Sequence, residues 1–167
     1  VAGRPGVLGA LSTTFLWITG NITLYACIAP FLSAHAGIAG GMLSATLVAF
    51  GVGAAIGNWG GGRASDRLGP FPALKLSLTG TLATQAALST LAVTMAPGSA
   101  AVAIAIILMM ILGAFGWAGH PAQSTRLVGL APDVAVVALS LNASALYFGI
   151  AAGAALGSFV ATYGSLW

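Results

Sequence analysis

Long apolar runs alternate with short polar connections along the chain. Five such runs can be distinguished, at about residues 7–32, 42–61, 74–95, 100–122 and 134–163. Crossing a bilayer as a helix takes about 20 residues, and each run reaches that length. The pattern predicts an all-α polytopic membrane protein in which a single transmembrane domain occupies residues 1–167.

The composition supports the same class of protein. Charged residues make up only 4% of the chain, whereas a soluble domain carries about a quarter. The net charge is +3, but the basic residues are few and scattered. They form no patch that a phosphate backbone would follow, so we expect no nucleic-acid partner. The one cysteine, Cys27, lies in an apolar run and leaves no disulfide framework.

All the basic residues fall in the N-terminal tail or in connections on one side of a five-span bundle. They are Arg4, Arg63, Arg67, Lys75 and Arg126. The connections on the other side, 35–41 and 96–99, contain no Lys or Arg. Because cytoplasmic loops carry an excess of these residues, the split predicts a cytoplasmic N-terminus and places Trp167 on the outer face.

The segment 60–69, Gly-Gly-Gly-Arg-Ala-Ser-Asp-Arg-Leu-Gly, is unusually polar for this chain. Its charged residues are Arg63, Asp66 and Arg67. Each would cost about 2.5–3.5 kcal/mol at the centre of a bilayer, so the segment must lie outside the hydrocarbon. We expect a tight connection between two spans, with Pro70 and Pro72 preventing any helical continuation.

Polar and aromatic residues inside the runs are the candidates for a binding site. Trp17, Asn21 and Tyr25 are spaced by four, which places them on one face of a helix. Asn21 and Tyr25 either bind a substrate or form a helix–helix hydrogen bond, which is worth on the order of 1 kcal/mol in membranes. His120 and Gln123 either face an inner vestibule or simply begin a cytoplasmic connection.

The two remaining sets of span residues are tryptophans and glycines. Trp17 and Trp117 either stack on a substrate or serve in packing. Glycines recur every fourth residue in the second and fifth runs, at Gly53, Gly57, Gly61, Gly149, Gly153 and Gly157. Small residues at this spacing let helix backbones approach closely in lipid, so we expect them to pack helices. Asn142 and Tyr147 are likewise expected to be packing groups.

A weak internal repeat is visible. The second and fifth runs share the glycine pattern. The first and fourth share a tryptophan, a glycine and a polar residue, at Trp17, Gly20 and Asn21 and at Trp117, Gly119 and His120. Two three-span units related by inversion would explain both, as in secondary transporters. Because glycine is abundant here, chance remains the alternative.

The segment 62–69 resembles the signature loop of the major facilitator superfamily, glycine-x-x-x-aspartate-arginine-x-glycine, although Pro70 replaces the usual arginine after it. Residues 20–32 look like the seventh helix of bacterial drug-proton antiporters and sugar-efflux members. Residues 121–123, 130–133 and 138–142 look like the tenth to eleventh helices of the same group. The resemblance covers nearly the whole chain.

The resemblance implies five helices of a six-helix half-bundle with inverted three-helix repeats. The chain begins at Val1 and has an odd number of predicted spans, so we expect it to be cut from a longer protein, with its N-terminal half and a sixth span missing. The implied partners are lipid, a small-molecule substrate and that N-terminal half. The implied location is the bacterial inner membrane.

The implied function is efflux of a sugar, nucleoside or drug by alternating access, coupled to protons. The predicted spans contain no Asp or Glu, although proton relays normally need an ionisable group in the membrane. We expect the carboxylate in the missing half, with His120 as the alternative. The segment 62–69 would act as a gate through the residues Gly62, Arg63, Asp66, Arg67 and Gly69, or it is an ordinary solvated connector.

A second class of function stays open, that of a non-transporting helical assembly module or a stand-alone half that dimerises. An enzyme is not expected. The sequence contains no metal-ligand cluster, no Ser-His-Asp set and no phosphate-binding loop after a strand. We therefore expect neither a metal site nor a cofactor.

Overall fold

The computed structural model describes residues 4–163, and five long helices make up almost all of this range. The helices are α1 (Val7–Ala36), α2 (Gly41–Leu68), α3 (Pro70–Thr94), α4 (Ser99–Leu130) and α5 (Ala135–Tyr163), with a short 3-10 turn, η1 (Pro132–Val134), before α5. Each long helix is apolar and long enough to cross a membrane by length and composition. The prediction of an all-α protein with five membrane-length helices is confirmed.

The charged segment 60–69 is not the connection that the sequence predicts. Helix α2 continues to Leu68, and only Gly69, with a φ of +89°, separates it from α3. Gly62, Arg63, Asp66 and Arg67 therefore lie on helical turns. Pro70 is the first residue of α3, a position where the N–H that proline lacks would have no hydrogen-bond partner within the helix. Pro70 therefore begins α3 as well as preventing the continuation of α2.

Two other helices extend beyond the apolar runs from which the sequence predicts them. Helix α1 passes through Pro30 and ends at Ala36, and α4 passes through Pro121 and ends at Leu130. His120 and Gln123 are therefore inside α4 and do not begin a connection. The extension of α4 is stabilised by Leu127, which is fully buried in an apolar cluster with residues of α1 and α5.

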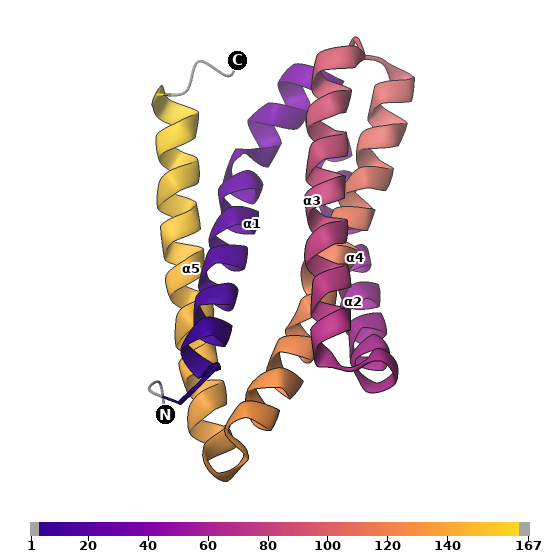
Figure 1. Ribbon diagram of the computed structural model, residues 1–167. Coiled ribbons are helices and arrows are strands. Elements are labelled where there is room, and N and C mark those ends of the chain that lie inside the picture. Colours follow the sequence, from indigo (N-terminus) through magenta and orange to yellow (C-terminus); the bar gives the residue numbers. More distant parts are fainter. Residues whose placement is uncertain (1–3, 164–167) are drawn as a thin grey trace.

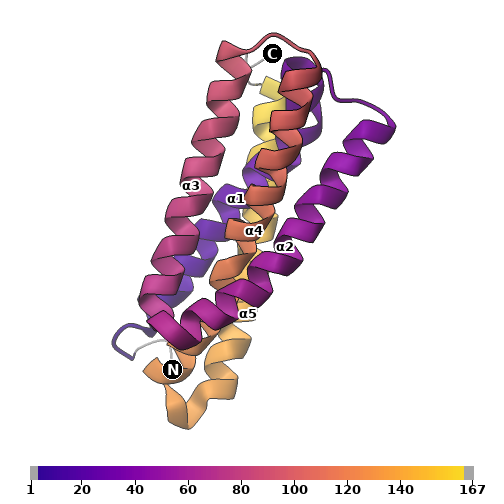
Figure 2. The same cartoon turned by 90° about the vertical axis from the view of Figure 1, so that its right-hand side faces the viewer.

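Successive helices run in opposite directions along the chain, and by their packing they form two groups. Helix α1 packs chiefly on α5, whereas α4 packs on both α2 and α3 (Figure 1). Figure 2 shows α4 between α2 and α3. The C-terminal part of α4 leaves its own group and runs to the base of α1 and α5, so it joins the two groups at that end.

The end where α2 meets α3 and α4 meets α5 also carries every Lys and Arg of the chain, and we call it the basic end. Arg4, before α1, donates from Nη2 to Oδ2 of Asp133 at 2.6 Å and from Nη1 to Oδ1. These hydrogen bonds and the carboxylate charge raise the pKa of the Arg4 guanidinium. The contact ties the start of α1 to η1.

At the opposite end the two groups meet through a larger apolar cluster. Its buried members come from α1, the α1–α2 connection, α3 and α4, namely Ile28, Leu32, Ala36, Ile38, Leu88, Leu91, Ala101, Ala105, Met109 and Leu112. The groups are thus in contact at both ends, and the residues between the ends are positioned by these contacts.

The glycine rows lie at the closest helix interfaces. A Cβ atom at Gly57 would collide with the carbonyl oxygen of Ala114 on α4, and Gly53 and Gly61 meet α4 in the same way one turn to either side. On α5, a Cβ atom at Gly153 would lie 2.6 Å from the carbonyl oxygen of Thr19 on α1. Both interfaces therefore require residues without a side chain.

The two glycine interfaces are built in the same register. Gly149, Gly153 and Gly157 face the backbone oxygens of Phe15, Thr19 and Thr23, just as the α2 glycines face Met110, Ala114 and Ala118. The pair of α5 and α1 thus repeats the pair of α2 and α4, as inverted three-helix units require.

This register corrects the alignment that the sequence suggests. It makes Phe15 equivalent to Met110, and hence Trp17 equivalent to Leu112 and not to Trp117. The shared Trp-Gly-polar pattern is therefore not part of the repeat. The glycine contacts define the repeat because they fix how far each helix slides along its neighbour.

Candidate functional site

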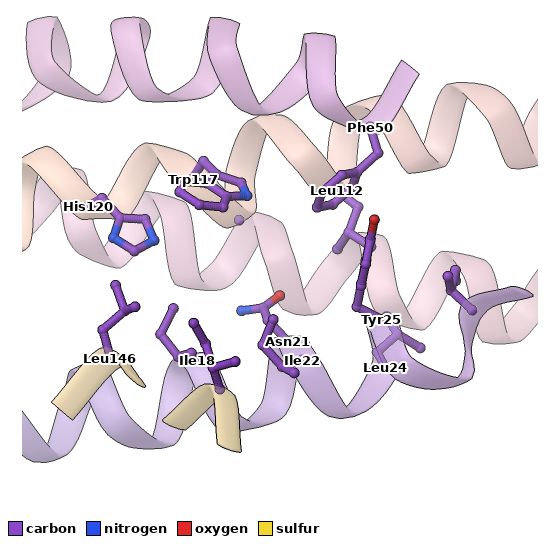
Figure 3. Close-up of a pocket in the computed structure, with 13 residues that line it drawn as sticks. Ile18, Asn21, Ile22, Leu24, Tyr25, Phe50, Leu112, Trp117, His120 and Leu146 are labelled. Atoms are coloured by element: carbon purple, nitrogen blue, oxygen red, sulfur yellow. The ribbon is translucent and has the colours of Figure 1, made fainter. Parts of the chain in front are cut away.

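A cavity of about 160 Å³ lies between the two helix groups and is lined by α1, α2, α4 and α5 (Figure 3). The lining residues are Ile18, Asn21, Ile22, Leu24, Tyr25, Ile28, Phe50, Leu112, Gly116, Trp117, His120, Leu146 and Ile150. The cavity wall is mostly aliphatic and aromatic, and four of these side chains bring polar atoms, namely Asn21, Tyr25, Trp117 and His120. Such a composition is typical of a small-molecule site.

Two aromatic pairs stand at different positions along the cavity. Trp117 and His120, from α4, stack with ring centroids 4.8 Å apart and planes 29° apart. Tyr25 of α1 and Phe50 of α2 are 5.2 Å apart and tilted by 42°. Figure 3 shows the first pair at one side of the view and the second at the other, with Asn21 and Ile22 between them.

Asn21 projects from α1 into the middle of this wall, and part of its amide is already engaged. Its Nδ2 donates to the carbonyl oxygen of Trp17 at 3.0 Å, and its Oδ1 accepts from Nε2 of Gln85 on α3 at 3.4 Å. An amide offers two donors and two lone pairs. Asn21 therefore retains one N–H and one lone pair for another partner.

The sequence does not single out Gln85 as a candidate for the site, although it holds a signal for this residue. It is a single amide in the long apolar run of α3, where a polar group normally needs a partner. Its bond to Asn21 connects the two helix groups beside the cavity.

The structure brings together four of the six candidate substrate-binding residues: Asn21, Tyr25, Trp117 and His120. Trp17 lies behind them, 8% exposed, with its ring centroid 4.8 Å from that of His120. Among the described residues, its Nε1 has no hydrogen-bond partner. Trp17 therefore supports His120 and does not line the cavity itself. It lines a second hollow between α1 and α3.

Gln123 lies away from the cavity, in a buried polar cluster. Its Nε2 donates to the carbonyl oxygen of Ala10 at 2.5 Å and to Oγ1 of Thr14 at 2.9 Å. Thr14 in turn donates to Oδ1 of Asn142 on α5 at 2.6 Å. The amide is 1% exposed and faces neighbouring helices, so the cluster links α4, α1 and α5.

The candidate gating residues lie at the basic end, outside the cavity lining. Asp66 and Arg67 are exposed on the last turns of α2. The guanidinium of Arg63 lies 3.7 Å from the centre of the Trp59 ring, one turn earlier, in a cation–π contact. The ion pair between Arg4 and Asp133 is the one salt bridge that the described residues form, so Asp66 is not in one.

The side chains of the site are suited to binding a molecule and not to reacting with it. Among residues 4–163, no three His, Cys, Asp or Glu side chains lie close enough to hold a metal ion. The cavity lining described above contains His120 as its one histidine and no cysteine, aspartate or glutamate. The arrangement can hold a small molecule through apolar, aromatic and a few hydrogen-bonding contacts.

Comparison with known proteins identifies two bacterial relatives. The chain is 31% identical over 148 residues to the uncharacterized MFS-type transporter YbcL of Bacillus subtilis (strain 168), which covers 88% of this chain and 36% of that protein. It is 34% identical over 162 residues to the inner membrane transport protein YdhP of Escherichia coli (strain K12), which covers 96% of this chain and 39% of that protein.

The chain therefore spans between a third and two fifths of the length of these relatives. They are transporters and not enzymes. No family model and no solved structure matches the chain.

Proposed function

Because the chain is homologous to transporters of the major facilitator superfamily over most of its length, we propose that it is part of a secondary active transporter. It corresponds in this proposal to helices seven to eleven, in the C-terminal half. The observation that carries the proposal is the cavity between α1, α2, α4 and α5, with Asn21, Tyr25, Trp117 and His120 on its wall.

This cavity is one wall of the solute site, and the N-terminal half of the same transporter supplies the other. Repeated helical units with a site at their interface are the usual construction of such transporters, which work by rocking one unit against another. The repeated glycine interfaces support this assignment, because they make each packed helix pair a rigid unit. Lipid covers the remaining apolar surface.

We place the basic end of the bundle in the cytoplasm. All five Lys and Arg residues of the chain lie at this end, which is the distribution of cytoplasmic segments. The name of the Escherichia coli relative supports the inner membrane as the location.

Transport is directed outward and is coupled to protons in this proposal. The acidic residues of the chain, Asp66 and Asp133, both lie at the basic end and outside the cavity lining. An intramembrane proton site needs an ionisable group. The carboxylate therefore comes from the N-terminal half, and His120 is the alternative within this chain.

Reconstitution of the full-length transporter tests the proposal. Proteoliposomes are offered labelled sugars, nucleosides and drugs, with and without an imposed pH gradient, and empty liposomes give the passive background. We expect saturable transport of at least one solute, accelerated by the gradient. Transport that never exceeds the background for any solute would contradict the transporter assignment.

A further inference from the structure

We infer that the cavity selects an uncharged, flat and largely apolar solute. This inference rests on the proposed transport function and names the class of molecule that the same site takes. Three features of the wall carry it, namely the absence of charged side chains, the small number of free polar groups and the placement of the aromatic rings.

The first feature is charge. Asp, Glu, Lys and Arg are absent from the lining formed by the described residues. A charged solute would lose its hydration against this apolar wall without gaining an ion pair from it, and an unpaired buried charge is strongly unfavourable. This half of the site therefore stabilises neither an anion nor a cation, and it favours a neutral solute.

The second feature is hydrogen bonding. Asn21 has one N–H and one lone pair left after its bonds to Trp17 and Gln85. The Tyr25 hydroxyl, the His120 imidazole and the Trp117 indole N–H add the remaining polar side-chain atoms of the wall. A sugar carries a hydroxyl on almost every carbon, and most would stay unpaired here, which costs binding free energy for each group. A molecule with one or two polar groups fits better.

The third feature is shape. The aliphatic side chains of Ile18, Ile22 and Leu112 line the cavity close to the aromatic pairs and offer a ring apolar contact. Trp117 stacks on His120 but remains 45% exposed, so the exposed part of its ring can stack on a planar ring of the solute in offset or edge-to-face geometry. A cation cage would need several ring faces directed at one point. Here the rings pair with each other, at separate places.

Binding to the full-length transporter in lipid nanodiscs tests this inference. The probes are 2-naphthol, its anionic analogue 2-naphthalenesulfonate, its cationic analogue 2-naphthyltrimethylammonium, and glucose. Calorimetric titration is corrected with empty nanodiscs for partition into lipid. We expect saturable binding of 2-naphthol, and binding of both charged analogues and of glucose that is weaker by about tenfold or more.

Substitutions assign the binding to the cavity. Trp117→Leu should weaken 2-naphthol binding about fivefold or more, since the stacking partner is lost. Trp59→Leu is the matched control, because Trp59 is also an exposed tryptophan, 62% accessible, but lies outside the lining. It should leave the affinity within about twofold. Trp117→Phe keeps a ring and should retain binding even if the leucine variant is poorly folded.

The outcomes separate this inference from the transporter assignment. Tighter binding of a charged analogue or of glucose, or equal effects of Trp117→Leu and Trp59→Leu, would overturn the solute class. If the transporter moves a sugar in a saturable way, the solute class is wrong while the transport function stands. If 2-naphthol binding depends on Trp117 but no solute is transported, the solute class stands and the transport function fails.

Discussion

At the scale of single residues, Asn21 takes part in a helix–helix contact and also lines the cavity. It joins α1 to α3 through Gln85 and still presents one N–H and one lone pair to the cavity. Both interpretations of this residue from the sequence, substrate ligand and helix–helix contact, are therefore compatible with its position. Substitutions on the two sides of the bond can separate them.

We predict that Asn21→Ala in the full-length transporter weakens solute binding several-fold, since a hydrogen bond contributes about 0.5–1.5 kcal/mol. Gln85→Leu removes only the contact between helices, so it should lower the melting temperature and leave affinity unchanged. Calorimetric affinity and thermal unfolding are measured for both variants. Unchanged affinity in Asn21→Ala, together with a lowered melting temperature, would favour a purely structural role.

In our account, the hydrogen-bonded cluster of Thr14, Gln123 and Asn142 stabilises the fold. Thr14→Val removes the hydroxyl that accepts from Gln123 and donates to Asn142, so a buried and a half-buried amide each lose a partner. We predict a loss of about 1–3 kcal/mol in unfolding free energy. Thr13→Val is the control, because Thr13 bonds only to Gly9 of its own helix, and it should cost less than about 0.5 kcal/mol. Equal losses in the two variants, measured by denaturant unfolding in detergent, would contradict this role.

Helix α2 shows, at the scale of elements, why a local pattern fails to give a boundary. Residues 60–69 combine glycine and charge, which locally favours a loop. In the fold, Gly61 and Ser65 are buried, and Gly61 packs against the backbone of α4. Most helical stability in proteins comes from such packing, so the helix continues through a sequence of low propensity. The sequence alone contains no information about that neighbour.

The same interface gives a prediction about glycine. Gly57→Ala places a methyl group against the backbone of Ala114, which cannot move without separating α2 from α4. We expect a destabilisation of about 1–3 kcal/mol from overpacking. Gly51→Ala, on the same helix with no atom within 4 Å, should be neutral or slightly stabilising. Thermal unfolding compares the two, and similar melting temperatures would show that the glycine contact is not required.

Asp66 is the candidate for a conformational role of the α2 terminus. By the family resemblance, such an acid meets a helix N-terminus of the other half when the cytoplasmic side is closed. The contact would contribute about 0.3–1 kcal/mol, and up to about 2 if partly buried, which shifts a two-state equilibrium by up to about thirtyfold. We predict that Asp66→Asn slows turnover and favours the inward-open state, with little change in solute affinity.

Asp133→Asn is the control for this effect, because it makes the same charge change at the same end of the bundle. It should leave the conformational equilibrium near wild type. Transport rate in proteoliposomes and the inward-open fraction, from spin-label distances across the basic end, are measured for both variants. If Asp66→Asn matches wild type in both measurements, Asp66 is a solvated residue without a gating function.

At the scale of the whole molecule, the sequence predicts the class of protein and the number of long helices, because hydrophobic length is a local property. It also places Asn21 and Tyr25 on one face of α1, and both line the cavity. The sequence could not separate Trp117 and His120 from Gln123, which is on the same helix but hydrogen-bonds to α1. That distinction depends on how helices are rotated against one another, which a single sequence does not encode locally.

The central claim is that the cavity between the two helix groups holds the transported solute. Gly116 lies on its wall, and a Cβ atom there would meet only Oδ1 of Asn21, at 3.8 Å, so Gly116→Leu fills the cavity without a backbone collision. Gly129→Leu is the control, because Gly129 is on the same helix, outside the lining, with no atom within 4 Å of an added Cβ.

The measurement is the initial rate of solute transport by the full-length protein in proteoliposomes, with melting temperature as a check on folding. We predict that Gly116→Leu reduces transport to the level of empty liposomes while its melting temperature stays near wild type, and that Gly129→Leu transports normally. Transport by Gly116→Leu at the wild-type rate would contradict the account, because the solute would then cross without entering this cavity.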